Sequence, residues 1–264
     1  MRTIAVFAFI SIASAAMSQS VLVRQNGSTS EFFYTTNPTD VDLQNAINAC
    51  SPGDTLILPG VTFVCGDNIV VDRSMVILGA GYDMTGATVD GPTFISFSSN
   101  LDDLRVTAAD VELHGLWVDG ARTWFQNDAN GIVAERCRFQ ELDLGTQFSP
   151  GPSNVTLRQC VVDGSVENGN ANNVSLYNCF VARVRLFEFQ NVLVDHCILE
   201  SQNFGSIGFN QGVEYKSCII LRSGVGGTSW QINEEADFEN CLFLSTAPIP
   251  LQFGTLVTEV NSVA

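Results

Sequence analysis

The amino-acid sequence predicts an all-β protein, a right-handed parallel β-helix solenoid with an N-terminal capping helix. Three observations lead to this fold class: a sequence repeat of about twenty residues, each copy of which we call a phrase, apolar residues that alternate within it, and a cysteine at the same place in most phrases. This place, which we call the cysteine slot, holds in successive phrases Leu116, Cys137, Cys160, Cys179, Cys197, Cys218 and Cys241. Steps of 18 to 23 residues between slots are typical of the coils of a solenoid.

Each phrase predicts two short strands joined by a corner. Apolar residues stand five and three places before the slot, at the slot and two places after it, while the two residues just before it are mostly polar. Alternation predicts strands, and the polar pair marks the corner. One inward row is expected three places before the slot: Leu113, Ala134, Leu157, Leu176, Val194, Tyr215 and Phe238. The cysteines form a second inward row of reduced thiols, since free Cys behaves as a small buried hydrophobic residue.

Turn-forming residues stand six places before the slots. They are Asp110, Gly131, Asn154, Asn173, Asn191, Gly212 and Glu235. Gly, and to a lesser degree Asn and Asp, accept the left-handed backbone that re-aims the chain into each new coil. Asn154 and Asn173 also begin glycosylation sequons, as Asn26 does. For Asn154 and Asn173 a role in the turn is favoured over glycosylation, because the row needs turn-forming residues whether or not a sugar is attached to them.

The first residues predict export. A positive residue, an apolar run and small residues follow one another in the order of a signal peptide, which we assign to residues 1–17. The run is too short to span a bilayer. Residues 18–264 form a single β-helix domain, because no linker or charge block divides them. We expect a secreted or cell-surface protein, with the periplasm as an alternative compartment.

The segment 41–64 predicts a cap on the first coil, consisting of an amphipathic helix, a turn and a strand. One helical face carries Leu43, Ala46, Ile47 and Cys50. A helix there covers an otherwise exposed core. Cys50 and Cys65 stand outside the row of slots and are the candidate disulfide.

The C-terminal segment 256–264 begins another coil, with Ser262 in the cysteine slot, and no cap follows it. A solenoid normally covers its last coil. We expect a partner there, self-association through the uncapped coil, or a longer native chain.

The formal net charge of −16 argues against two classes of partner. Such an acidic surface repels phosphate backbones and anionic lipid heads, so nucleic acid and membrane surfaces are poor candidates. Carboxylates also collect hard cations, which makes calcium the cofactor to consider. Asp119 and Asp163 are each followed by Gly at matching places two coils apart, with Gln140 between them. This row is the candidate metal site, and a plain Asp-Gly turn is the favoured alternative.

The stretch from Asp42 to Gly60, followed by coils with Asn-Cys or a similar pair at the corner, resembles the pectate-lyase-like β-helix superfamily. The resemblance covers nearly all of the mature chain and implies the fold, without matching a specific enzyme family. Members of the superfamily include polysaccharide lyases, polysaccharide hydrolases, phage tailspikes and non-catalytic surface proteins. The resemblance therefore implies no single chemistry.

A β-eliminating lyase needs cations that neutralise a uronate carboxylate and a base, such as Arg or Lys, that removes the neighbouring proton. The candidate catalytic residues are Arg183, Arg185 and Arg222. Asp163 and Glu200, on the coils either side of Arg183, are candidates for substrate binding. The alternative is a set of solvated ion pairs, because charges already alternate along an exposed row two places before the slot. That row contains Glu135, Arg158, Asp195, Lys216 and Glu239.

A hydrolase of this fold needs two or three close carboxylates instead. The candidates are diffuse: Glu141 with Asp143, and the adjacent Asp102 and Asp103. Exposed aromatic residues stack on sugars, and Trp124 and Trp230 are candidates for this role, with core packing as the alternative.

Short steps between coils argue against catalysis, because a groove that buries a sugar chain usually needs raised loops. We therefore expect a secreted β-helix that binds extracellular carbohydrate or a cell-surface partner without catalysis. The alternative is a polysaccharide lyase, or a glycoside hydrolase, that acts on an acidic polysaccharide.

Overall fold

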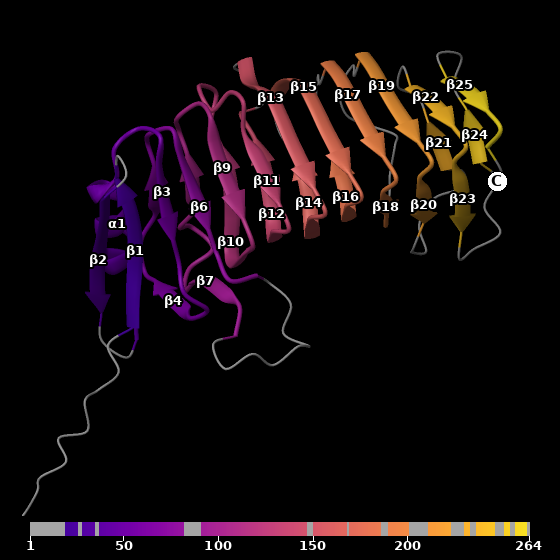
Figure 1. Cartoon of the computed structure of the whole chain (residues 1–264). Helices are drawn as coiled ribbons and strands as arrows, with labels where there is room; N and C mark the ends of the chain where they lie inside the picture. Colours follow the sequence, from indigo (N-terminus) through magenta and orange to yellow (C-terminus); the bar gives the residue numbers. More distant parts are fainter. Residues whose placement is uncertain are drawn as a thin grey trace, which may run out of the picture.

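The structure is a computed structural model of the chain. It describes residues 19–25, 28–34, 37–81, 91–146, 150–167, 169–185, 190–200, 211–222, 230–232, 236–245, 251–253 and 257–262. The segment 1–17 and the residues Asn26 and Glu235 lie outside these ranges. Strands from successive coils lie side by side along the length of the molecule (Figure 1). The predicted parallel β-helix is confirmed.

One sheet, sheet A, has twelve strands in the described part of the chain. Their spatial order is β2 (Ser28–Tyr34), β1 (Gln19–Gln25), β3 (Asp54–Ile57), β6 (Met75–Leu78), β9 (Val111–His114), β11 (Val133–Glu135), β13 (Pro150–Arg158), β15 (Asn170–Tyr177), β17 (Gln190–Asp195), β19 (Gln211–Lys216), β22 (Ala236–Glu239) and β25 (Val257–Val260). From β3 onward the neighbours are parallel.

The other large sheet, sheet B, has eleven strands among the described residues. Its main order is β23 (Leu242–Ser245), β20 (Ile219–Arg222), β18 (Ile198–Leu199), β16 (Phe180–Arg185), β14 (Val161–Glu167), β12 (Arg138–Leu144), β10 (Leu116–Phe125), β7 (Thr93–Phe97) and β4 (Thr62–Cys65), while β8 (Leu104–Val106) pairs with β10 and with β5 (Ile69–Val71). A separate pair joins β21 (Trp230–Ile232) to β24 (Leu251–Phe253).

The core lies between the sheets and consists of side chains stacked in register. The inward row predicted from Leu113 to Phe238 is buried at all seven positions. Register pairs such as Leu157 with Leu176, and Leu176 with Val194, place like residues on one another. Near the C-terminal end, the rings of Tyr215 and Phe238 stack with centroids 4.7 Å apart.

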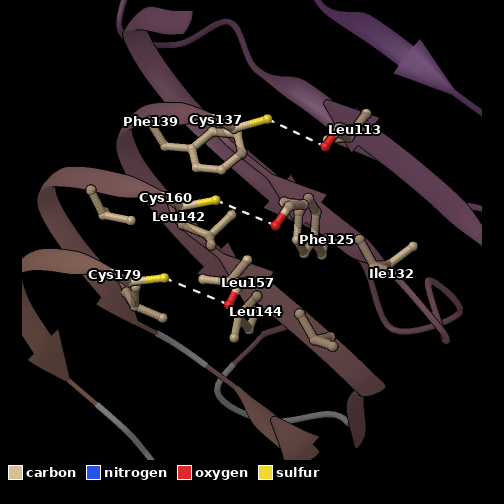
Figure 2. Packing of buried hydrophobic residues seen from close by; sticks show 14 of the residues in the cluster. Leu113, Phe125, Ile132, Cys137, Phe139, Leu142, Leu144, Leu157, Cys160 and Cys179 are labelled. Carbon is tan, nitrogen blue, oxygen red and sulfur yellow. Dashed lines mark hydrogen bonds between the residues drawn. The ribbon is translucent and has the colours of Figure 1, made fainter. Parts of the chain in front are cut away.

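The six slot cysteines are buried and free, as predicted. Each thiol donates a hydrogen bond to a backbone carbonyl of the preceding coil, such as Cys137 Sγ to Leu113 O at 3.4 Å and Cys179 Sγ to Leu157 O at 3.6 Å (Figure 2). Ser262 completes the row: its Oγ accepts a hydrogen bond from the Cys241 N–H at 3.1 Å and donates one to Phe238 O at 3.5 Å. The slot therefore selects a small side chain that can donate to a carbonyl.

Two rows of left-handed residues turn the chain in every coil. The predicted turn row has positive φ at each described position: Asp110, Gly131, Asn154, Asn173, Asn191 and Gly212. A second row lies directly before the slot, at Gly115, Arg136, Gln159, Asn178, His196, Ser217, Asn240 and Asn261. This second row is the predicted corner, and its left-handed conformation was not anticipated because Arg and Gln seldom adopt it.

Asparagine side chains connect neighbouring turns. Asn173 Nδ2 donates to Asn154 Oδ1 at 2.5 Å, and Asn191 Nδ2 donates to Asn172 Oδ1 at 2.9 Å. The turn role of Asn154 and Asn173 is confirmed.

The N-terminal end carries the predicted helix, α1 (Asp40–Ala49), whose buried residues Leu43, Ala46 and Ile47 join the core. Asp42 Oδ2 accepts a hydrogen bond from the Thr39 N–H at 2.8 Å and so stabilises the helix start. The hairpin formed by β1 and β2 was not predicted, and β1 pairs with β3 in antiparallel orientation. Among the described residues, no helix combines the length and the hydropathy needed to cross a membrane.

The expected disulfide between Cys50 and Cys65 is wrong for this structure, in which both thiols are free and buried. Each thiol lies against a nearby carbonyl: Cys50, which directly follows α1, donates from Sγ to Ala46 O at 3.4 Å, and Cys65 donates from Sγ to Phe63 O at 3.8 Å. Burial raises the pKa of Cys50 to about 11 and that of Cys65 to about 12. These cysteines contribute as core side chains instead of as a covalent link.

Candidate functional site

Two outward rows of polar side chains cross the N-terminal and central coils of sheet B. The first row runs from Asp103, directly before β8, through Arg122, Glu141 and Ser165 to Arg183. The second contains Arg105, Trp124, Asp143 and Glu167, and the backbone of Arg185 aligns with Glu167. We call the nine residues whose side chains are described the arginine–tryptophan face.

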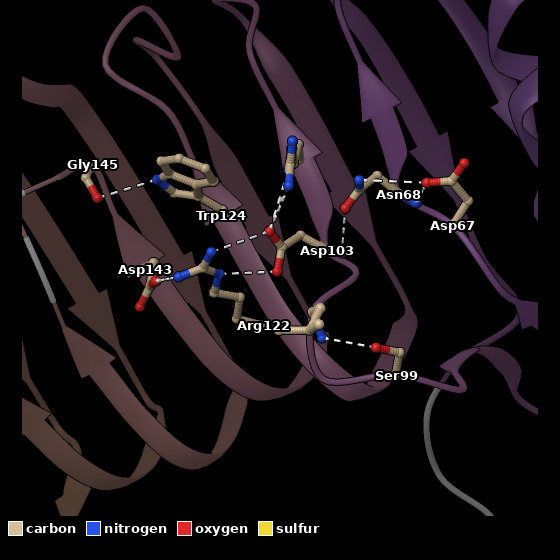
Figure 3. Close-up of polar contacts among 10 residues, drawn as sticks. Asp67, Asn68, Ser99, Asp103, Arg122, Trp124, Asp143 and Gly145 are labelled. Carbon is tan, nitrogen blue, oxygen red and sulfur yellow. Dashed lines mark hydrogen bonds and ion pairs between the residues drawn. The ribbon is translucent and has the colours of Figure 1, made fainter.

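Arg122 is the centre of an ion-pair network (Figure 3). Its Nε lies 2.9 Å from Asp103 Oδ1, and its Nη1 lies 3.2 Å from Asp143 Oδ2. The side chains of Asp103 and Asp143 are 0% and 4% exposed, whereas that of Arg122 is 42% exposed. Hydrogen bonding with Asp103 raises the pKa of Arg122 above its usual range. A guanidinium with a raised pKa stays charged, so Arg122 is unsuited to act as a base. Its three nitrogens already donate to the carboxylates of Asp103 and Asp143.

Trp124 lies beside this network and is half-buried. Its indole Nε1 donates to Gly145 O at 3.1 Å (Figure 3), which holds the ring in place. The guanidinium carbons of Arg122 and Arg105 lie 5.1 and 5.6 Å from the ring centroid. Arg105 also pairs with Asp103 at 3.2 Å. The ring is therefore held in a fixed frame of charged groups, with part of its surface open to solvent.

Arg183 stands at the other end of the face and is exposed. It aligns with Ser165 on the preceding strand, and Ser165 Oγ donates to Glu141 Oε1 at 3.0 Å. In the part of the chain that the structure describes, the Arg183 side chain makes no ion pair or hydrogen bond. The backbones of Arg185 and Arg222 are described but their side chains are not, so the three-arginine cluster stays a prediction.

Asp163 does not join Arg183. Its carboxylate pairs instead with Arg138 on the preceding coil, Oδ2 to Nε at 2.7 Å and Oδ1 to Nη2 at 3.1 Å. The Arg138 guanidinium also lies over the Trp117 ring, 4.5 Å from its centroid. Asp163 is therefore paired with Arg138, and its role in substrate binding stays a prediction.

Glu200 is half-buried, follows β18 directly, and its N–H donates to Val181 O at 2.9 Å. Its predicted role in substrate binding stays a prediction. The side chain of Trp230 lies outside the described residues, and its predicted role stays a prediction.

The predicted metal row of Asp119, Gln140 and Asp163 stays a prediction, and two of its members have other partners in the structure. Gln140 Oε1 accepts a hydrogen bond from the Gly120 N–H at 2.7 Å, and Asp163 is paired with Arg138. These oxygens satisfy neighbouring donors, and the Asp119–Gly120 segment is a bulge between β10 and β12. Among the described ranges, no three His, Cys, Asp or Glu side chains are grouped so that they could hold a metal ion.

Asp103 and Asp143 came from two different carboxylate pairs in the sequence, yet Arg122 brings them together. Sequence reasoning did not single out Arg122 or Arg105. The usable signal was weak, because the number of residues between slot and face changes from coil to coil: Arg122, Glu141 and Ser165 lie six, four and five places after their slots. Counting from the slot therefore misaligns this row.

Fold and site together define a parallel β-helix with an outward face of arginine, carboxylate and tryptophan side chains. The sequence matches no protein-family model and no curated protein sequence. In solved structures, it is similar to an alginate lyase from Paenibacillus sp. str. FPU-7, with a TM-score of 0.37, 15% identity, and coverage of 86% of this chain and 98% of that one. It is also similar to the Agl-KA catalytic domain, with a TM-score of 0.49, 15% identity, and coverage of 87% of this chain and 57% of that one. Likeness at this level assigns neither family nor activity.

Proposed function

We propose that this protein binds a polysaccharide along the arginine–tryptophan face and that it does so without catalysis. The observation that carries the proposal is the half-open Trp124 ring held between two guanidinium groups and a backbone carbonyl. Aromatic rings supply apolar area for the faces of sugars, and a ring that is already immobilised loses little entropy on binding. Arginine and carboxylate groups beside it supply donors and acceptors for hydroxyl groups.

The length of the face supports a chain ligand over a single sugar. Trp124 on β10 and Arg183 on β16 are separated by three strand steps, about 14 Å at the usual strand spacing. The exposed guanidinium group of Arg183 at one end supports a polysaccharide that carries carboxylates, because Arg binds carboxylate with two parallel hydrogen bonds.

Binding is tested by affinity electrophoresis in gels that contain polygalacturonate, alginate or a neutral glucan. We expect retardation by an acidic polysaccharide, and about tenfold weaker binding for Trp124→Ala, equal to a loss of about 1.4 kcal/mol. Trp117→Ala is the matched control, since Trp117 is on the same strand and also under a guanidinium. Equal loss in both variants, or no retardation of the native protein, contradicts the proposal.

The second candidate is β-elimination of a polyuronate, and it is favoured by the exposed Arg183 side chain, which makes no ion pair with the described residues. The test follows the ultraviolet absorbance of unsaturated chain ends with and without calcium. A signal that Arg183→Ala abolishes establishes the lyase, while no signal across the panel of acidic polysaccharides leaves the binding proposal.

We also propose export to the cell surface or medium, where such a ligand or a cell-surface partner is found. Mass spectrometry of the protein from its natural source is expected to find a new N-terminus near residue 18. Light scattering over a range of concentrations tests self-association through the last coil, for which we expect a mass above that of the monomer.

A further inference from the structure

A hollow of about 340 Å³ lies on sheet A, at the corner that leads to sheet B. It is lined by Glu135, Arg158, Gln159, Tyr177 and Asn178. Glu135, Arg158 and Tyr177 are register neighbours on β11, β13 and β15. Gln159 and Asn178 are corner residues. None of the five belongs to the arginine–tryptophan face, so the hollow is a separate feature of the molecule.

The backbone around the hollow is held in place. Gln159 and Asn178 are both left-handed with φ of 53°. The Gln159 N–H donates to Tyr177 O at 2.9 Å, and the Asn178 N–H donates to Asp195 O at 3.0 Å. Each corner is thus tied to the next coil, and a ligand would meet a surface that is already formed. Preformed sites bind more tightly because no segment has to be ordered.

Among the residues that the structure describes, the charged groups around the hollow have partners, with one exception. Glu135 lies 3.7 Å from His114 Nδ1 and 3.8 Å from Arg136 Nε. The carboxylate of Asp195, the register neighbour of Tyr177, lies 2.7 Å from Nδ1 of His196.

Arg158 is the exception. In the described part of the chain its exposed guanidinium makes no ion pair or hydrogen bond, and neither do the Tyr177 hydroxyl and the Asn178 amide. The neighbouring Arg136, by contrast, donates to Gln159 Oε1 at 3.0 Å. One uncommitted cation, one aromatic ring and one amide therefore converge on the hollow.

We infer that this hollow binds a single uronic acid residue. Arg158 holds the carboxylate through its planar fork, the half-buried Tyr177 ring packs against the sugar, and the Asn178 amide contacts hydroxyl groups. The volume is near the lower end of the range of about 300 to 1,000 Å³ for small-ligand sites, which suits one sugar residue. The inference is independent of the proposed polysaccharide face. Where both sites bind one polymer, the second contact strengthens attachment by raising the local concentration of ligand.

The experiment is saturation-transfer NMR on the full chain, with glucuronic acid and galacturonic acid as probes and glucose as the neutral control. We expect binding of a uronic acid with a dissociation constant on the order of 1 mM, and at least about tenfold weaker binding of glucose. Arg158→Gln is expected to remove the preference for the acid. Arg158→Lys keeps the positive charge but lacks the planar guanidinium group, and it is expected to retain part of the preference for uronic acid over glucose. Tyr177→Leu weakens binding of acid and glucose alike.

Lys216→Gln is the matched control, because Lys216 is a half-exposed cation on the same outward row of sheet A. It is expected to bind the acids as the native chain does. The inference is overturned by three results: no acid binding by the native chain up to about 10 mM, unchanged preference in Arg158→Gln, or equal loss in Lys216→Gln. Trp124→Ala separates the two proposals, since it is expected to lose polysaccharide binding and to keep the monosaccharide signal.

Discussion

The two large sheets use left-handed glycine in different ways. On sheet A, Gly131 and Gly212 share a row with Asn154, Asn173 and Asn191, and all five residues have positive φ. On sheet B, Gly120 lies in a bulge, also with positive φ, where an added Cβ would overlap the carbonyl oxygen of Phe97.

Asparagine is therefore compatible with this row of sheet A, where an added Cβ would meet only the ends of side chains, Asp110 Oδ1 at Gly131 and Asn191 Oδ1 at Gly212, before any backbone atom. On sheet B the neighbouring coil leaves no room for a side chain. The comparison teaches that glycine in the repeated turn row is needed for its left-handed backbone angle. Glycine in a bulge is needed because another coil approaches closely.

The largest expected effect comes from placing asparagine at both kinds of glycine. Gly120→Asn is expected to lose about 3 to 4 kcal/mol of unfolding free energy, because the side chain overlaps backbone atoms. Gly212→Asn is expected to change it by less than about 0.5 kcal/mol, since its Cβ would meet its nearest atom, Asn191 Oδ1, at 3.6 Å. Urea unfolding monitored by circular dichroism measures both. Similar losses would remove the distinction between the two sheets.

Alkaline pH tests the core that both sheets share. The folded-state pKa values of Cys50 and Cys65 are raised by burial to about 11 and about 12, so folding favours the neutral thiols. Their contribution is complete below the unfolded pKa near 9 and is lost as pH rises through 11 and 12.

Stability should therefore fall above pH 9, by about 3 kcal/mol for Cys50 alone at roughly 1.4 kcal/mol per pKa unit. Unfolding titrations from pH 8 to 12 measure the decline. Cys50→Ala is expected to give a shallower decline, and an identical slope in the variant contradicts the assignment.

Two arginines of sheet B sharpen the comparison of buried and exposed charge. Arg122→Met is expected to cost about 2 to 3 kcal/mol, because it leaves the buried carboxylates of Asp103 and Asp143 with less compensation. Arg138→Met, whose partner Asp163 is 38% exposed, is expected to cost less than about 1 kcal/mol. Chemical unfolding of both variants measures the two losses of unfolding free energy. A larger loss for Arg138→Met would show that the network around Arg122 is not the stabilising one.

The smallest effect is expected at the corner row before the slots. Ser217 and Asn240 both have positive φ, near 54°, on adjacent coils. Ser217→Asn is expected to raise the free energy of unfolding by about 0.5 kcal/mol, and Asn240→Ser to lower it by a similar amount, because Asn tolerates the left-handed region better. Thermal unfolding of the two variants provides the measurement. Shifts of the same sign in both variants would exclude this explanation.

Much of sheet A could be predicted from sequence, because the left-handed turn row lies six places before the slot in every coil that the structure describes. The inward row and the turn row are confirmed for this reason. The candidate site was predicted only in part. Trp124 and Arg183 were named, but the pairing of Asp163 with Arg138 was not predicted, and Arg122 was not named. Bulges of different length after the slots shift the register of sheet B, and this shift is not visible from counting.

The sequence by itself determined the solenoid, the buried thiol row and the turns, since each depends on residues close together in the chain and repeated in every coil. Only the tertiary structure decided which charges meet. Arg122 contacts Asp103 and Asp143, which are 19 and 21 residues away, through a register set by Gly120 and the backbone of the preceding coil. The hollow at Tyr177 likewise exists only where three coils lie side by side. The repeated sequence pattern specifies the fold of each coil, and the stacking of coils of unequal length decides which side chains meet on the surface.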